Sequence, residues 1–256
     1  MLLRLVKKTV FLYIYSIDTD GNVYLTDTGF TEQIIKYDAQ GNYLMSFGDG
    51  YGDYVGELDR PRGLAVNSFN GDGTHIFLML FSYIFPIVWV AERYGYRFTV
   101  FDRNGTVKDT FGGDLWGSAN YYIGNVYQST SVVIDPSGHK VYVGDIFNKR
   151  IQVWDYNTRE WDRFDNGQPM GNMWNLWADE YGRVFTTEYD DGRLQMLNQC
   201  GETIATTNVI ADKFTVIGNE IYAVDYRNYV YQLEVQCEDG WFGIECNYGK
   251  QREMCF

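Results

Sequence analysis

Histidine, proline and clustered basic residues are scarce in this 256-residue chain. It contains two histidines, four prolines, and 21 Lys and Arg against 34 Asp and Glu, which gives a net charge of −13. Nucleic-acid binding depends on basic residues that neutralise phosphates, so we expect no nucleic-acid partner. The two histidines, His75 and His139, cannot by themselves supply a three-ligand zinc site.

Long uncharged segments are also missing. The uncharged run of residues 76–91 has 16 residues, whereas a membrane-spanning helix needs about 20, so we expect no membrane span. Within this run, residues 77–87 (FLMLFSYIFPI) interrupt an otherwise regular pattern. Three interpretations stay open: an extended hairpin packed on a neighbour, a loop that docks on a membrane or a partner, or a segment foreign to the mature protein.

The N-terminal segment has a basic start followed by an apolar stretch at residues 9–15. It resembles a secretory signal peptide loosely, because the apolar stretch is short and no small-residue cleavage site follows it. An innermost or closing strand of the fold is the other interpretation.

What the chain has in abundance is repetition. One phrase, an acid, a turn with glycine, Val or Ile, an aromatic and another acid, recurs at residues 18–27, 135–145 and 179–188. A shorter copy ends at Asp225, and a copy split by the apolar insert occupies residues 63–92. Such self-similarity indicates a repeat architecture, and we count five repeats.

Each repeat predicts several short strands. An apolar run, a turn with Gly or Asn, a second strand and a third strand follow in the same order, and some repeats add a fourth strand such as residues 43–47 or 107–111. Four short strands joined by hairpins are typical of a propeller blade. We therefore predict an all-β propeller of four-stranded antiparallel blades over residues 1–235 and a separate tail over residues 236–256.

An acidic residue ends the second strand of every repeat. Its recurrence favours a structural role shared by all blades over a catalytic one, and we predict that it caps the loop after that strand by accepting backbone N–H groups. The five residues are Asp27, Glu92, Asp145, Glu188 and Asp225.

Three segments carry a family resemblance. VYLTDTGFTEQIIKYDAQGNYLMSFG at residues 23–48, DPSGHKVYVGDIFNKRIQVWD at 135–155 and GELDRPRGLAV at 56–66 resemble the NHL-repeat propellers, with Pro61 opening a blade. The resemblance implies six blades, whereas five repeats are visible. It also implies an alternative function, a calcium-dependent hydrolase or lyase similar to lactonases or amidating lyases, with oxygen ligands for calcium in the central channel. No catalytic residue and no resident cofactor are assigned.

Three of the four cysteines fall in the last 20 residues. CEDGWFGIEC at residues 237–246 resembles the final loop of an EGF-like module, which implies a Cys237–Cys246 disulfide; Cys255 would then pair with Cys200 or with a residue beyond the end of this sequence. Free thiols and a zinc site are the alternatives. Disulfides predict an extracellular or secretory-lumen location.

Aromatic residues follow several of the repeated acids. We predict that Tyr94, Tyr96, Phe147 and Tyr189 contact a ligand, because exposed aromatics favour protein contacts or carbohydrate stacking. The predicted function is therefore an extracellular scaffold that binds a protein or a glycan through loops between blades. Seven further loop aromatics either join this surface or pack between blades: Trp116, Tyr121, Tyr122, Tyr127, Trp161, Trp174 and Trp177.

Overall fold

The computed structural model describes residues 12–67, 87–112 and 122–234, except for positions 169, 180, 181, 189, 191, 208, 210, 212, 218, 219 and 226–228. These residues form five antiparallel sheets, each built from consecutive strands. Blade 1 holds β1 (Leu12–Ile17), β2 (Val23–Asp27), β3 (Gln33–Tyr37) and β4 (Tyr43–Phe47). Blade 2 holds β5 (Pro61–Asn67), β6 (Ile87–Glu92), β7 (Arg97–Asp102) and β8 (Val107–Gly112).

The other three blades follow in chain order. Blade 3 holds β9 (Ser131–Ile134), β10 (Lys140–Asp145), β11 (Arg150–Asp155) and β12 (Glu160–Arg163). Blade 4 holds β13 (Met173–Ala178), β14 (Val184–Glu188), β15 (Arg193–Leu197) and β16 (Thr203–Thr207). Blade 5 has three strands among the described residues, β17 (Lys213–Ile217), β18 (Glu220–Val224) and β19 (Val230–Glu234).

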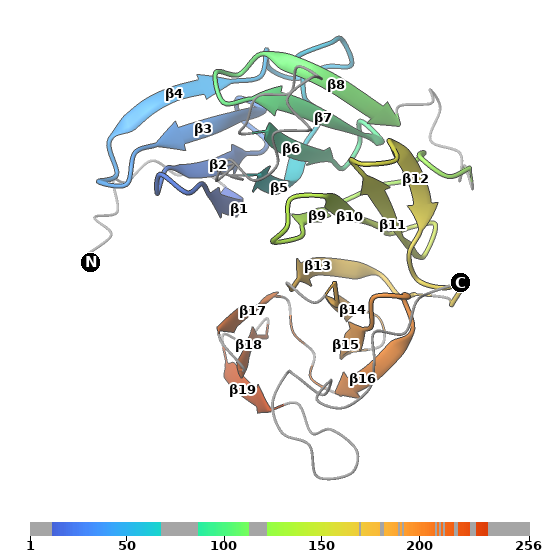
Figure 1. The fold of residues 1–256 in the computed structure, drawn as a ribbon. Coiled ribbons are helices and arrows are strands. Elements are labelled where there is room, and N and C mark those ends of the chain that lie inside the picture. The colour runs from blue at the N-terminus through green and yellow to red at the C-terminus, as the bar shows by residue number, and fades with distance from the viewer. Residues whose placement is uncertain are drawn as a thin grey trace.

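The sheets are arranged radially (Figure 1), with the first strand of each blade innermost. These inner strands pack in chain order, β1 on β5, β5 on β9, β9 on β13 and β13 on β17. Within the described part of the chain, β1 and β17 do not pack on each other in the same way and lie at the two ends of an open arc. Radially arranged antiparallel sheets define a β-propeller.

The count of five repeats is confirmed, because each repeat forms one sheet. The six blades that the resemblance implied are not found: the described strands make five. Several predicted strands coincide with observed ones; residues 43–47 are β4, and Pro61 is the first residue of β5. Proline suits this place because the first residue of a strand can lack a ladder N–H.

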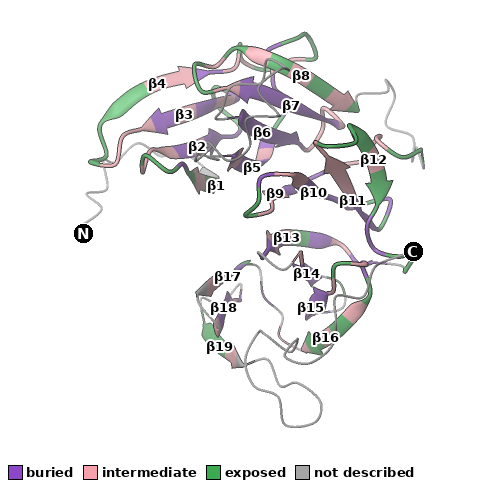
Figure 2. Cartoon of the chain, in the orientation of Figure 1, coloured by how far each residue is buried: buried purple, intermediate pink, exposed green. Residues whose placement is uncertain are grey.

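The apolar core is divided among the blade interfaces. Tyr24 and Phe47 of blade 1 pack with Val88 and Phe101 of blade 2. Similar buried clusters join blades 2 and 3, 3 and 4, and 4 and 5. Figure 2 shows a related pattern, with buried residues concentrated on middle strands such as β6, β7 and β14 and exposed residues on β4, β8, β12 and β16. Sheets are therefore held to each other by side-chain packing, whereas hydrogen-bond ladders stay inside each blade.

Aspartates shape the tight turns. In the β1–β2 turn, Asp18 Oδ1 accepts the N–H groups of Asp20 and Asn22, at 3.0 and 2.8 Å. Asp38 and Asp102 do the same in the β3–β4 and β7–β8 turns. These side chains mimic a backbone turn, and of the three, Asp18 is the first acid of the repeated phrase.

Two predicted segments lie outside the described residues. The insert at residues 77–87 is represented by its last residue, Ile87, which is buried, pairs with Asn67 and begins β6. The tail at residues 236–256, with three of the cysteines, lies wholly outside, so the EGF-like interpretation stays a prediction. The described residues include no helix long and apolar enough to cross a bilayer.

Candidate functional site

One face of the propeller gathers two kinds of connection. Because adjacent strands run antiparallel, the linker that enters a blade and the loop between its second and third strands lie at the same edge of the sheet. The described parts of these connections are residues 48–60 and 93–96 in blade 2, and residues 122–130 and 146–149 in blade 3. The repeated acids stand at this edge.

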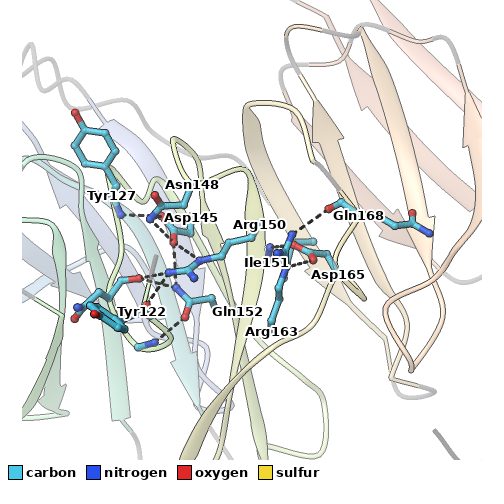
Figure 3. A network of polar contacts seen from close by, with 12 residues as sticks. Tyr122, Tyr127, Asp145, Asn148, Arg150, Ile151, Gln152, Arg163, Asp165 and Gln168 are labelled. Carbon is cyan, nitrogen blue, oxygen red and sulfur yellow. Dashed lines mark hydrogen bonds and ion pairs between the residues drawn. The ribbon is translucent and has the colours of Figure 1, made fainter. Parts of the chain in front are cut away.

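In blade 3 the acid Asp145 is the centre of a buried polar network (Figure 3). Its carboxylate accepts hydrogen bonds from Arg150 Nε at 2.7 Å, from Asn148 Nδ2 at 2.9 and 3.0 Å, and from the Tyr127 N–H at 2.7 Å. Arg150 also donates to the Tyr122 and Asn125 carbonyls of the linker. The acid and the arginine thus clamp the linker from blade 2 onto blade 3.

Blades 2 and 4 repeat the acid–arginine pair. Arg97 donates to Glu92 at 2.9 Å and also to linker carbonyls, including Glu57 O at 2.8 Å. Arg193 donates to Glu188 at 2.5 Å. Burial raises the pKa of Glu92 and of Asp145, and their arginines counteract only part of this shift. Buried charges need such partners, so the pairs are structural.

The predicted cap, an acid that accepts backbone N–H groups of the loop after its strand, is found at Asp225, which accepts the Tyr229 N–H. Asp27 bonds to its following loop through the Thr31 hydroxyl instead. Glu92 and Asp145 instead accept N–H groups of the preceding linker, at Asp59 and Tyr127. The reason is the arginine five residues after each acid, Arg97 or Arg150. It also donates hydrogen bonds to linker carbonyls and so holds the linker over the carboxylate.

Above these clamps lies a surface that we call the aromatic–arginine strip. It crosses the connections of blades 2 and 3 without interruption. Its residues are Arg60, Arg93, Tyr94, Tyr96, Tyr127, Gln128 and Phe147.

The aromatic half of the strip is a row of three rings. Tyr96 stacks on Tyr127 with centroids 5.3 Å apart, and Tyr127 contacts Phe147 at 5.1 Å. The Phe147 N–H donates to the Tyr127 carbonyl at 3.3 Å, which ties the blade 3 loop to the linker. Phe147 is 49% exposed, so the row presents an apolar surface to solvent.

The arginine half surrounds Tyr94. The Arg60 and Arg93 guanidinium carbons lie 4.6 and 5.2 Å from the Tyr94 ring centre. Arg93 Nε donates to Gln128 Oε1 at 3.3 Å, and Gln128 is adjacent to Tyr127. Cation–π contacts of this kind hold guanidinium groups flat on an aromatic ring.

The structure thus brings together three of the four predicted ligand-contact residues, Tyr94, Tyr96 and Phe147, on one surface; Tyr189 lies outside the described residues. Whether they contact a ligand stays a prediction. Sequence reasoning missed Arg60, Arg93 and Gln128. The available signal was position, because Arg60 directly precedes a blade-opening proline and Arg93 directly follows a repeated acid.

Other loop aromatics pack inside. Trp161 contacts Trp89 and stacks on Phe98, and Trp177 contacts Phe185 at 5.3 Å. Trp174 and Tyr122 are 40% and 78% exposed. The packing interpretation therefore holds for Trp161 and Trp177, whereas Tyr127 belongs to the strip. Trp116 and Tyr121 lie outside the described residues.

His139 lies half-buried in the β9–β10 turn, at the opposite edge of blade 3 from the strip. Over the described ranges, no group of three or more His, Cys, Asp and Glu side chains is placed to hold a metal ion. His75 lies outside those ranges. A calcium-dependent site stays a prediction.

Comparisons with known proteins give the fold. No family model and no curated protein matches the chain. A chain of the nidogen–laminin complex is similar with a TM-score of 0.63 and 16% identity over 88% of this chain and 76% of that one. A streptogramin B lyase follows, with a TM-score of 0.58 and 13% identity over 92% and 72%. The virginiamycin B lyase of Staphylococcus aureus has a TM-score of 0.56 and 11% identity over 90% and 72%.

These similarities support the propeller class and nothing finer, because all identities are low. The fold is shared by a chain from a protein–protein complex and by lyases, and one fold supports many unrelated functions. The functional argument therefore depends on the strip itself.

Proposed function

We propose that this protein is an extracellular interaction module that binds a partner protein through the aromatic–arginine strip. The observation that carries the proposal is the contact row Tyr96–Tyr127–Phe147, which joins connections of two blades and leaves Phe147 half-exposed. Aromatic residues and arginine are the side chains that dominate binding energy at protein interfaces.

The rigidity of the strip supports this proposal. The buried Asp145 fixes the backbone of Tyr127, and Arg97, directly after Tyr96, is fixed by Glu92. A surface held by buried ion pairs loses little conformational freedom on binding, so more of its contact energy appears as affinity. The similar chain from the nidogen–laminin complex shows that a propeller of this shape occurs in a protein–protein complex.

The proposed extracellular location depends on the cysteines. Cys200 lies half-buried in the β15–β16 turn, and the proposal gives it a disulfide partner. The other cysteines of the chain are Cys237, Cys246 and Cys255, and stable disulfides belong to oxidising compartments. Mass mapping of disulfide-linked peptides from the secreted protein would identify the pairing; recovery of Cys200 as a free thiol would contradict the location.

The test of binding compares two matched variants of the whole chain. Tyr127→Ser/Phe147→Ser removes the centre of the ring row, whereas Tyr43→Ser/Tyr54→Ser removes two exposed tyrosines outside the strip. We expect a partner identified by crosslinking in the secretome to lose roughly tenfold or more affinity for the first variant, since central aromatics contribute about 2 kcal/mol or more each. Equal binding by both variants would refute the proposal, and strip-dependent binding on a glycan array would assign the surface to a glycan.

The enzymatic alternative has its own measurement. A calcium-dependent hydrolase or lyase should melt at a higher temperature with calcium than with a chelator and should turn over lactone or ester substrates. Both results together would replace the interaction module by an enzyme.

A further inference from the structure

Two guanidinium groups share one tyrosine ring in the strip. Arg60 comes from the linker before β5 and Arg93 from the β6–β7 loop, and both lie within about one ring diameter of the Tyr94 centre, at 4.6 and 5.2 Å. The backbone locks them in place, because the Arg93 N–H donates to the Arg60 carbonyl at 3.1 Å. Both groups carry a positive charge at the same ring, so an anion bound beside Tyr94 would be attracted by both.

No carboxylate forms an ion pair with either arginine among the described residues. The six ion pairs there involve Arg97, Lys108, Arg150, Arg163, Arg183 and Arg193. The buried carboxylates of Asp59 and Glu32 lie near Arg60 and attract it from a distance, and the Glu32 oxygens accept the backbone N–H groups of Gly29 and Arg60. Arg93 keeps one polar contact, to Gln128.

This arrangement is unusual for a chain of net charge −13. Exposed arginines in an acidic protein have many carboxylates with which to pair, yet this pair stays on the surface beside an apolar row. A guanidinium stacked on a ring keeps its N–H edge free for a carboxylate, which it binds through two parallel hydrogen bonds.

We propose that Arg60 and Arg93 together bind a carboxylate side chain of the partner protein, and that the Tyr96–Tyr127–Phe147 row takes an apolar side chain next to it. The inference rests on the proposed function and adds the chemistry of the partner: an exposed loop with an Asp or Glu beside an apolar residue. A carboxylate is favoured over a long sulfated or phosphorylated polymer, because the net negative charge of the protein repels polyanions beyond the first contact.

The test uses a library of random 12-residue peptides displayed on phage and selected on the whole protein. Three forms are compared: wild type, Arg60→Gln/Arg93→Gln, and the matched charge control Arg103→Gln/Arg159→Gln. Arg103 and Arg159 are exposed and lie in the β7–β8 and β11–β12 turns, at the opposite edge of the blades. Thermal melts of all variants check that each one folds.

We expect wild type and control to enrich peptides with an acidic residue beside an aromatic or aliphatic one, and Arg60→Gln/Arg93→Gln to bind these peptides roughly tenfold more weakly. The variant Arg60→Lys/Arg93→Lys should recover part of the affinity, because lysine keeps the charge but lacks the planar fork. An Asp→Asn or Glu→Gln change in the peptide should lower its affinity for wild type. The factor should match the one by which Arg60→Gln/Arg93→Gln weakens binding of the unchanged peptide.

Three outcomes would overturn the inference. Peptides that require Tyr127 and Phe147 but show no acidic preference leave the proposed function standing and remove the carboxylate role. Peptides that bind equally to Arg60→Gln/Arg93→Gln and to the control Arg103→Gln/Arg159→Gln would also remove the carboxylate role. Heparin that binds wild type, loses binding to Arg60→Gln/Arg93→Gln and displaces the peptides would make the ligand a sulfate. Selection of no strip-dependent peptide would count against the proposed function itself.

Discussion

Blade 1 and blade 2 share a sequence pattern but differ in what surrounds it. In blade 2 the acid Glu92 is buried against Arg97, and the linker from blade 1 covers both. In blade 1 the acid Asp27 pairs with Gln33, which takes the place of the arginine, and Tyr15 and Ile17 of the inner strand are 67% and 54% exposed. The middle blades therefore have a neighbouring blade on each side, whereas blade 1 packs mainly on one side, against blade 2.

The difference shows what each half of the repeated phrase does. The turn half is local, because Asp18 of blade 1 and Asp135 of blade 3 each accept a backbone N–H of their own turn. The acid half is an interface signal, because the arginine paired with it in blades 2 and 3 also bonds to the preceding linker. A blade can keep the first half and lose the second.

The largest test of this comparison removes the clamp. Arg150→Met leaves the Asp145 carboxylate buried without its cation, and we expect the free energy of unfolding to fall by about 3–5 kcal/mol. Gln33→Met at the equivalent position of blade 1 removes one hydrogen bond, to Gly48 O at 2.9 Å, and should cost about 1 kcal/mol. Urea unfolding followed by tryptophan fluorescence gives both values, and equal losses would mean that blades 1 and 3 are stabilised alike at this edge.

A second test uses the turn glycines. Gly105 and Gly41 occupy the same position of the β7–β8 and β3–β4 turns, with φ of 81° and 85°. A Cβ at Gly105 would overlap Phe47 of blade 1, whereas a Cβ at Gly41 meets nothing within 4 Å.

We therefore expect Gly41→Ala to cost about 1–2 kcal/mol from its left-handed backbone. Gly105→Ala should cost about 1–3 kcal/mol more from the overlap. The two melting temperatures measure the gap, and a Gly41→Ala variant as unstable as Gly105→Ala would reveal a neighbour for blade 1.

The smallest effect concerns the turn aspartates, where the two blades should agree. The Asn42 side chain and backbone lower the pKa of Asp38; in Asp102, burial raises the pKa but the Thr106 N–H and Lys108 outweigh it, so it too is lowered. A lowered carboxyl pKa contributes stability above the unfolded-state pKa of about 3.9, and that stability is lost as the pH falls through the folded-state pKa.

NMR titration of the carboxyl carbons should therefore show the pKa of Asp38 rising toward its usual value in Asn42→Ala and that of Asp102 rising in Lys108→Ala. An unchanged pKa in either variant would mean that the turn contacts do not stabilise the carboxylate.

Much of the fold was predictable because it depends on neighbours in sequence. Strand order, the turn aspartates and the blade-opening Pro61 all follow from local patterns. The strip was predictable only in part. Tyr94 and Tyr96 could be named from one repeated position, but their contacts with Arg60 and Tyr127 join separate connections of the chain. Such contacts depend on linker paths, which no periodicity encodes.

The arc of separate sheets has a mechanical consequence. Among the described strands no hydrogen-bond ladder crosses from one blade to the next, so a small rotation at a blade interface breaks no strand pairing. In a closed circle, such a rotation must be cancelled elsewhere. In the described arc, β1 and β17 do not pack on each other as the other neighbouring inner strands do, so the rotation can change the curvature of the arc. The aromatic–arginine strip crosses the interface of blades 2 and 3. A partner bound to both blades would therefore fix the angle between them.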